Sequence, residues 1–165
     1  MPSFERLKSY APSIGNFLIA IGVATALGSI VQTQMNLAAL QALGAPIPAG
    51  IRLWTTAEDL IGFTPAYGGI VTAAFLFAMP AASTLSIYLR STRLGQAWIS
   101  SLVFALAAAL CLGIVLKMTD AIAPMPTLIA ATRSDAGTAW MLLGAALGAL
   151  VFAGLRRRRR REGSP

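Results

Sequence analysis

The stretch AWMLLGAALGALVFAGLRRRRRR, residues 139–161, joins an apolar run directly to six consecutive arginines. The apolar part, residues 139–155, approaches the roughly 20 residues that an α-helix needs to cross the hydrocarbon core of a bilayer. A dense cationic cluster beside such a run resists translocation and marks the cytoplasmic end of the helix. The junction therefore predicts a membrane-spanning helix together with its orientation.

The composition of the whole chain predicts an integral membrane protein. Hydrophobic residues make up 56% of the 165 residues and charged residues only 12%, whereas soluble domains carry about 25% charged residues. So few charges cannot cover the water-facing surface of a soluble protein of this size. The length leaves room for one membrane domain, residues 1–165, and little else.

Four apolar runs are about long enough to cross a membrane, at roughly 14–35, 69–89, 97–116 and 139–155. A backbone that crosses lipid must satisfy its own hydrogen bonds, which leaves α-helices or a closed β-barrel. A barrel requires alternating apolar and polar residues, whereas these runs are continuously apolar. The predicted fold class is therefore all-α: a polytopic membrane protein with a four-transmembrane-helix bundle.

The distribution of the 13 Lys and Arg residues assigns the two sides of this bundle. The N-terminal arm, the link between the second and third runs, and the tail 156–165 carry all of them except three. The other side holds only Arg52, Lys117 and Arg133. Because cytoplasmic segments carry the excess of Lys and Arg, we expect both termini in the cytoplasm and a location in the bacterial inner membrane.

An alternative for the first apolar run is a secretory signal peptide. Residues 1–28 have a basic start, the apolar stretch 17–27, and small residues at Ala24 and Ala26. Cleavage would leave three helices in the same orientation. The apolar character continues through Ile30, beyond the place where a cleaved segment becomes polar, which favours an uncleaved spanning helix.

The first outer loop, residues 36–67, is too long for a plain turn. Residues 44–48, Gly-Ala-Pro-Ile-Pro, end any helix that leaves the membrane. Thr55 and Glu58 have the spacing of a capping box, in which a hydroxyl and a carboxylate bond early helical N–H groups reciprocally. This motif predicts a short helix over residues 56–62.

The short helix is predicted to be interfacial because its surroundings are strongly apolar. Leu53, Leu60 and Ile61 would be costly to leave in water, at about 25 cal/mol per Å². We expect the segment to lie in the membrane interface or to pack over the outer ends of the first two spanning helices. Trp54 and Tyr67 suit the headgroup level.

Polar residues gather where the first spanning helix meets this outer loop. Gln32 and Asn36 are four residues apart and therefore share a helix face. Two interpretations stay open: amides that hydrogen-bond neighbouring helices, or an outward-facing ligand pocket. The candidate pocket residues are Gln32, Asn36, Arg52, Glu58 and Asp59.

Pairs of small residues at four-residue spacing predict close helix contacts. They occur in the fourth, first and third runs as Gly144 and Gly148, Gly22 and Ala26, and Ala105 and Ala109. The pattern predicts a compact bundle. Use of the same face between two chains would instead give a homodimer.

The arginine cluster is predicted to contact anionic lipid and not nucleic acid, because no aromatic residues alternate with the cations to stack on bases. Each arginine near an anionic membrane surface contributes about 1 kcal/mol of attraction. The predicted lipid contacts are Arg156, Arg157, Arg158, Arg159, Arg160 and Arg161.

The chain lacks the residue types on which many membrane enzymes and ion-coupled transporters depend. It has no histidine, the commonest metal ligand and the usual general base near neutral pH. Its single cysteine, Cys111, sits in an apolar run, and no ionisable residue lies near the middle of a predicted span. We therefore predict no catalytic residue, no metal site and no cofactor.

The first functional hypothesis is a non-enzymatic accessory or scaffold subunit that contacts the lipid bilayer and a membrane-protein partner or a second copy. One alternative is a small transporter or channel subunit that uses the outward-facing pocket. Another is an enzyme acting on a lipid or quinone at the outer interface, with Glu58 or Asp59 as the acid or base. A co-purifying protein would favour the subunit, and a bound lipid or quinone would favour a pocket.

Overall fold

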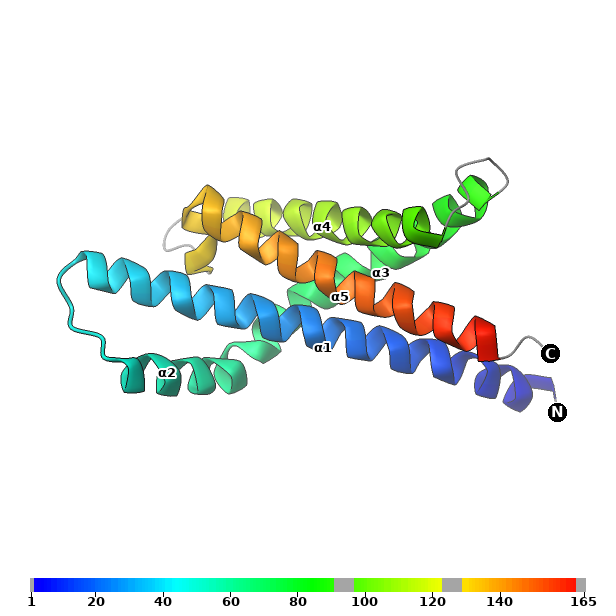
Figure 1. The fold of residues 1–165 in the computed structure, drawn as a ribbon, viewed down its shortest axis with the longest axis horizontal. Helices are drawn as coiled ribbons and strands as arrows, with labels where there is room; N and C mark the ends of the chain where they lie inside the picture. Colours follow the sequence, from blue (N-terminus) through cyan, green and yellow to red (C-terminus); the bar gives the residue numbers. More distant parts are fainter. Residues whose placement is uncertain (1, 91–96, 123–128, 163–165) are drawn as a thin grey trace.

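The computed structural model describes the backbone of residues 2–90, 97–122 and 129–162, and every regular element in these ranges is helical. The elements are α1 (Pro2–Ala42), α2 (Ala49–Gly62), α3 (Thr64–Arg90), α4 (Ala97–Ile122), the 3-10 helix η1 (Ala130–Arg133) and α5 (Asp135–Glu162) (Figure 1).

Four of these helices are long and apolar enough to cross a membrane. The candidate spans among the described residues are Ser13–Ala42, Thr64–Leu89, Trp98–Ile122 and Asp135–Arg159. The predicted all-α four-helix bundle is therefore confirmed. Each helix is longer than the apolar run that predicts it, because polar residues at the ends continue the helix beyond the part suited to lipid.

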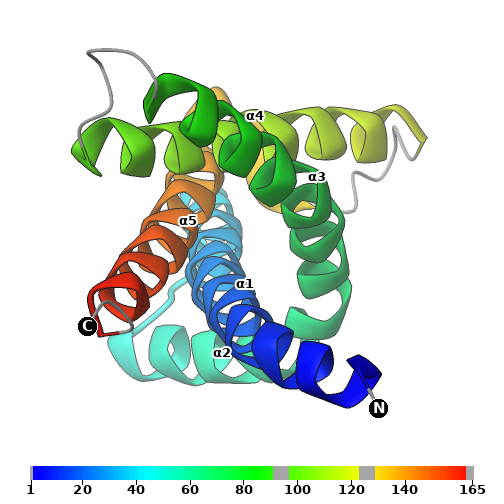
Figure 2. The same ribbon diagram turned by 90° about the vertical axis from the view of Figure 1, so that its right-hand side faces the viewer.

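The four long helices pack as a closed ring. In Figure 2, α1 and α5 are seen roughly along their axes, and α4 crosses the top of the view. α5 packs against α1 and α4, and α3 packs against α4 and α1. The start of α1 and the end of α5 lie at the same end of the bundle (Figure 1). α5 stays helical through the arginines to Glu162, so the predicted basic tail begins as a continuation of the spanning helix.

The contact between α1 and α5 depends on two glycines of α5. A Cβ atom added at Gly148 would lie 2.7 Å from the carbonyl oxygen of Ala20 and 2.8 Å from the Cβ of Ala24. A Cβ atom at Gly144 would lie 3.3 Å from the Cβ of Leu27. Only residues without a side chain let the two backbones approach so closely.

This packing confirms the small-residue face predicted on α5 but corrects its counterpart on α1. The counterpart is Ala20 and Ala24, both fully buried, whereas Gly22 is exposed with nothing within 4 Å of an added Cβ. The predicted pairing through Gly22 and Ala26 is wrong because these residues lie on a different face of the helix. Since the glycine face of α5 is occupied within the chain, a homodimer would need another surface.

The outer segment forms a helix, but it begins seven residues before the predicted start. Pro48 is extended, with φ −65° and ψ 157°, and its carbonyl accepts the first helical bond from the Arg52 N–H at 3.1 Å. Thr55 and Glu58 therefore lie inside α2, and the predicted capping box is wrong. The proline ring fixes a φ that is already helical, so α2 begins without a side-chain cap.

The end of α2 agrees with the prediction. The helix ends at Gly62, and α3 follows after the single residue Phe63, whose N–H donates to the Asp59 carbonyl at 2.9 Å. α2 contacts both α1 and α3, as expected for a helix at the outer ends of the first two spans.

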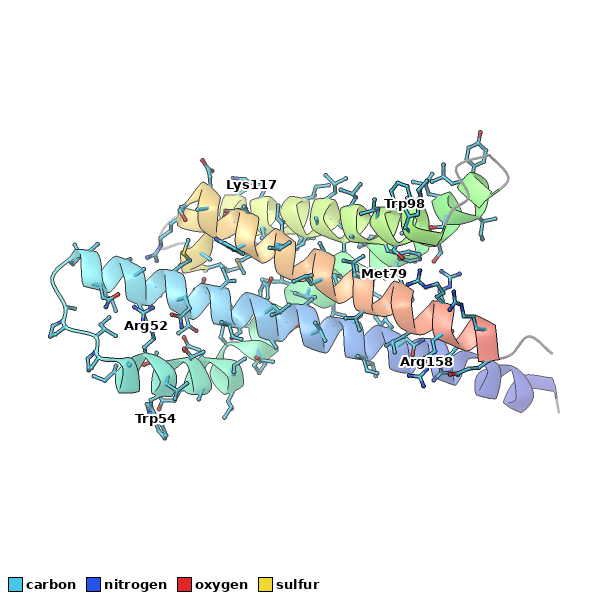
Figure 3. All side chains as sticks on the ribbon, viewed as in Figure 1. Arg52, Trp54, Met79, Trp98, Lys117 and Arg158 are labelled. Atoms are coloured by element: carbon cyan, nitrogen blue, oxygen red, sulfur yellow. The ribbon has the colours of Figure 1, made fainter. Side chains whose placement is uncertain are left out.

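Tyr67, which was predicted at the headgroup level, is completely buried, so its ring contacts other parts of the protein and not lipid headgroups. Its ring occupies the space that Gly28 of α1 leaves open, where an added Cβ would clash with ring atom Cε1. The ring also stacks on Phe63, with centroids 5.5 Å apart and planes 11° apart. Trp54, by contrast, is exposed and points away from α1 (Figure 3).

Candidate functional site

The candidate site is the contact between α2 and the outer part of α1. In Figure 1 the last turns of α1 reach farther than the neighbouring ends of α4 and α5, and α2 folds back beside them. The polar side chains of this contact come from both helices: Ser29, Thr33, Gln34 and Gln41 of α1, and Arg52, Thr56 and Asp59 of α2.

The last turn of α2 is held to α1 by two hydroxyl groups. The Thr33 hydroxyl donates to Oδ2 of Asp59 at 2.8 Å and lies 3.0 Å from the Ser29 carbonyl. The Ser29 hydroxyl donates to the backbone carbonyl of Asp59 at 3.2 Å. Both donors are buried, at 0% and 1% exposure. Because a carboxylate is a strong acceptor, Thr33 and Asp59 fix the position of α2 on α1.

The first turns of α2 are held by the Arg52 side chain, which lies between α1 and α2 in Figure 3. Its guanidinium donates to Oε1 of Gln34 and to Oε1 of Gln41, both at 2.5 Å. Nε2 of Gln34 in turn donates to the Thr56 hydroxyl at 2.9 Å, which fixes the orientation of that amide. Within the described ranges, no carboxylate forms an ion pair with Arg52.

The five predicted pocket residues do not form one hydrogen-bonded cluster. Arg52 and Asp59 both take part in the contact between α1 and α2. They are seven residues apart on α2, however, and they bond different residues of α1. Gln32 turns to η1, where its Oε1 accepts from the Ala131 N–H at 2.7 Å. Asn36 and Glu58 are exposed, and neither side chain bonds another residue in the part of the chain that the structure describes.

The residues that make most of the contact are not among the predicted pocket residues: Ser29, Thr33, Gln34, Gln41 and Thr56. A signal for them exists in the spacing. Ser29 and Thr33 are four residues apart, and Gln34 and Gln41 are seven apart, so each pair lines one side of a helix that continues to Ala42.

α2 has the reverse of the orientation usual for an amphipathic helix. Its polar side faces α1, and none of its residues is buried. Leu53, Trp54 and Ile61 are 75%, 67% and 79% exposed. With Ala57 they form the outer face of α2, at positions i, i+1, i+4 and i+8. Leu53, Trp54 and Ile61 therefore do not pack on the bundle, whereas hydrogen bonds join the polar side of α2 to α1. A position in the membrane interface stays a prediction.

At the opposite end of the bundle, the arginines have different environments. Arg156 donates to the Ser83 hydroxyl of α3 at 2.9 Å and lies 5.6 Å from the centre of the Phe104 ring of α4. Nε of Arg158 bonds Oε1 of Glu162 at 2.9 Å, with both side chains exposed. The side chain of Arg160 lies outside the described residues.

No cluster of three His, Cys, Asp or Glu side chains suited to a metal ion occurs in the described ranges. Cys111 is a half-buried free thiol. Comparisons with protein family models, with curated proteins and with solved structures find no match to this chain.

Proposed function

We propose that this protein is a multi-pass, non-enzymatic subunit of the bacterial inner membrane, with both termini in the cytoplasm. In this proposal it binds another membrane protein through the outer face of α2. The observation that carries the proposal is the outward orientation of Leu53, Trp54 and Ile61 on a helix whose polar face is already used.

The topology is supported by the agreement between charge and fold. The arginine cluster, the start of α1 and the end of α3 lie at one end of the bundle (Figure 1). Arg52 and Lys117 belong to helix ends at the other. An even number of spans with the cationic end in the cytoplasm satisfies the positive-inside rule.

The partner is a membrane protein because of where the outer face of α2 lies. α2 is one residue from the spanning helix α3, so the face is tethered at the membrane boundary. In Figure 1 the first part of α2 reaches past the ends of α4 and α5, and the whole of α2 lies on the side of α1 away from α4, so these helices do not cover its outer face. An exposed apolar face bordered by polar residues is typical of an interaction surface, and a tryptophan within it is typical of an energetic centre.

The outward-pocket transporter or channel and the interfacial enzyme receive less support from the same geometry. Arg52 is fixed by two amides, and Asp59 is fixed by Thr33. A general acid or base must reach its substrate within hydrogen-bond distance. The Asp59 oxygen that accepts the hydrogen bond from Thr33 is already used in the contact between α2 and α1.

Purification from native membranes tests the proposal. We expect a membrane protein to co-purify in stoichiometric amount with the unaltered chain, and to be lost from the double variant Trp54→Ala and Ile61→Ala. Glu58→Ala is the matched control, because Glu58 is exposed on the same helix and bonds no other described residue. The absence of a stoichiometric partner from the unaltered chain would contradict the proposal, as would retention by the double variant.

A further inference from the structure

A pocket of about 400 Å³ opens between α4 and α5 at the end of the bundle that carries the arginines. Its polar lining comes from Ser101 of α4 and Arg157 of α5, and its apolar lining from Leu102, Leu150 and Trp98. The pocket thus combines a hydroxyl and a guanidinium with an apolar wall, where a spanning helix meets its cationic extension.

The six arginines are not equivalent, and Arg157 is the one that faces this pocket. Arg156 turns into the bundle toward Ser83 and Phe104, and Arg158 is paired with Glu162. Arg157 is exposed, and its guanidinium donates to no other residue in the described part of the chain. Its donors are therefore available to a ligand.

The charge around the pocket selects an anion. Arg157 also borders a second hollow, which it shares with Arg158 and Arg161. Among the described residues that line this hollow, Glu162 is the only acidic one, so positive charge predominates. A guanidinium presents a planar fork of N–H donors that matches two oxygens of a phosphate. This match points to a phosphate group as the part that is bound.

The apolar wall identifies the rest of the ligand. Leu102 and Leu150 are exposed on the outside of the bundle. Farther from the arginines, the outer faces of α4 and α5 continue with exposed leucines. An acyl chain lying along these residues would keep its phosphate beside Arg157. The exposed Trp98 indole suits the headgroup level. Basic pockets between spanning helices on the cytoplasmic side are typical sites for anionic lipid headgroups.

We propose that this pocket is a specific site for one anionic phospholipid, with Arg157 binding its phosphate and Leu102 and Leu150 contacting its acyl chain. The site differs from the diffuse attraction that all six arginines exert on a membrane surface. It is also independent of the partner proposed for α2, which lies at the opposite end of the bundle.

The test compares two variants with the same change in charge. Full-length protein in a neutral detergent is titrated with phosphatidylglycerol, and bound lipid is counted by native mass spectrometry. We expect Arg157→Gln to weaken binding by roughly ten-fold or more, as for the loss of a charge-assisted hydrogen bond. Arg159→Gln, on an exposed residue of the same helix that does not line the pocket, should change it by less than about two-fold, as a screened surface charge does.

Further measurements separate the shape of the guanidinium from its charge, and a phospholipid ligand from free phosphate. Arg157→Lys keeps the charge but loses the fork, so an affinity between those of the unaltered chain and Arg157→Gln is expected. Phosphatidylcholine should bind weakly, and millimolar inorganic phosphate should not displace the phospholipid. Equal losses from Arg157→Gln and Arg159→Gln would overturn the specific site. Displacement by inorganic phosphate alone would overturn its assignment to a lipid.

Discussion

The hydroxyl of Thr33 on α1 donates a 2.8 Å hydrogen bond to the carboxylate of Asp59 on α2. Thr33 is 1% exposed, so this bond lies at the buried side of the contact between the two helices. Together with the bond from Ser29 to the Asp59 carbonyl, it turns the polar side of α2 toward α1. The apolar side of α2 must then face outward, and this orientation is the basis of the proposed function.

Replacing Thr33 by valine should loosen α2 without unfolding the bundle. Valine has nearly the same shape but cannot donate to Asp59, and the lost bond corresponds to about 1 kcal/mol. Hydrogen exchange of the α2 amides should become faster, while the amides of α4 and α5 keep their protection.

Thr84→Val is the control for this change, because the Thr84 hydroxyl is exposed and bonds only carbonyls of its own helix, at 2.8 and 3.2 Å. Unchanged exchange of α2 in Thr33→Val would show that the hydroxyl does not hold the helix.

Gly148→Ala should destabilise the contact between α1 and α5. The added methyl group would lie 2.7 Å from the Ala20 carbonyl oxygen and 2.8 Å from the Ala24 Cβ. Neither of these atoms can move aside by a side-chain rotation. We expect a loss of about 1–3 kcal/mol, the usual cost of overpacking, measured as a lower midpoint of unfolding in detergent.

Gly22→Ala is the matched control on α1, since nothing lies within 4 Å of an added Cβ there. It should be neutral or slightly stabilising, because alanine has the higher helix propensity. Equal effects of the two substitutions would contradict the assigned helix faces.

The topology predicts the location of reporters fused to the chain. Fusions after Gly44, Arg93, Met125 and Gly163 should report outside, inside, outside and inside in turn, because the proposed topology places the cationic segments in the cytoplasm. Activity of a reporter specific for the outside at the Gly163 fusion would contradict the orientation.

The spans and their number were predictable from the sequence because the transfer of a helix into lipid depends on summed apolarity over roughly 20 residues. The helix ends were less predictable. α1 continues through Gln34 and Gln41 to Ala42, where the helix has left the apolar run and its polar residues pair with α2. Hydropathy carries no information about a helix that projects from the bundle.

The candidate site was predicted at the right place with partly the wrong residues. Arg52 and Asp59 do contact α1, but through Gln34 and Thr33, which lie two residues and one residue after Gln32. One residue turns a helix by about 100°, so Gln32 faces η1 instead. Which residues of α1 face α2 and which face η1 is decided by packing against segments that are distant in sequence.

The capping box predicted at Thr55 was wrong because a threonine three residues before a glutamate also occurs inside a helix. Here the helix had already begun after Pro48.

Photo-crosslinking in native membranes tests the outer face of α2 most directly. A photoreactive amino acid placed at Leu53, which is 75% exposed and is the first residue of that face, should form one discrete adduct with another membrane protein. The same group at Asn36, exposed on the neighbouring part of α1, should not form that adduct. Adducts with lipid alone at position 53, or the same protein adduct at both positions, would contradict the account.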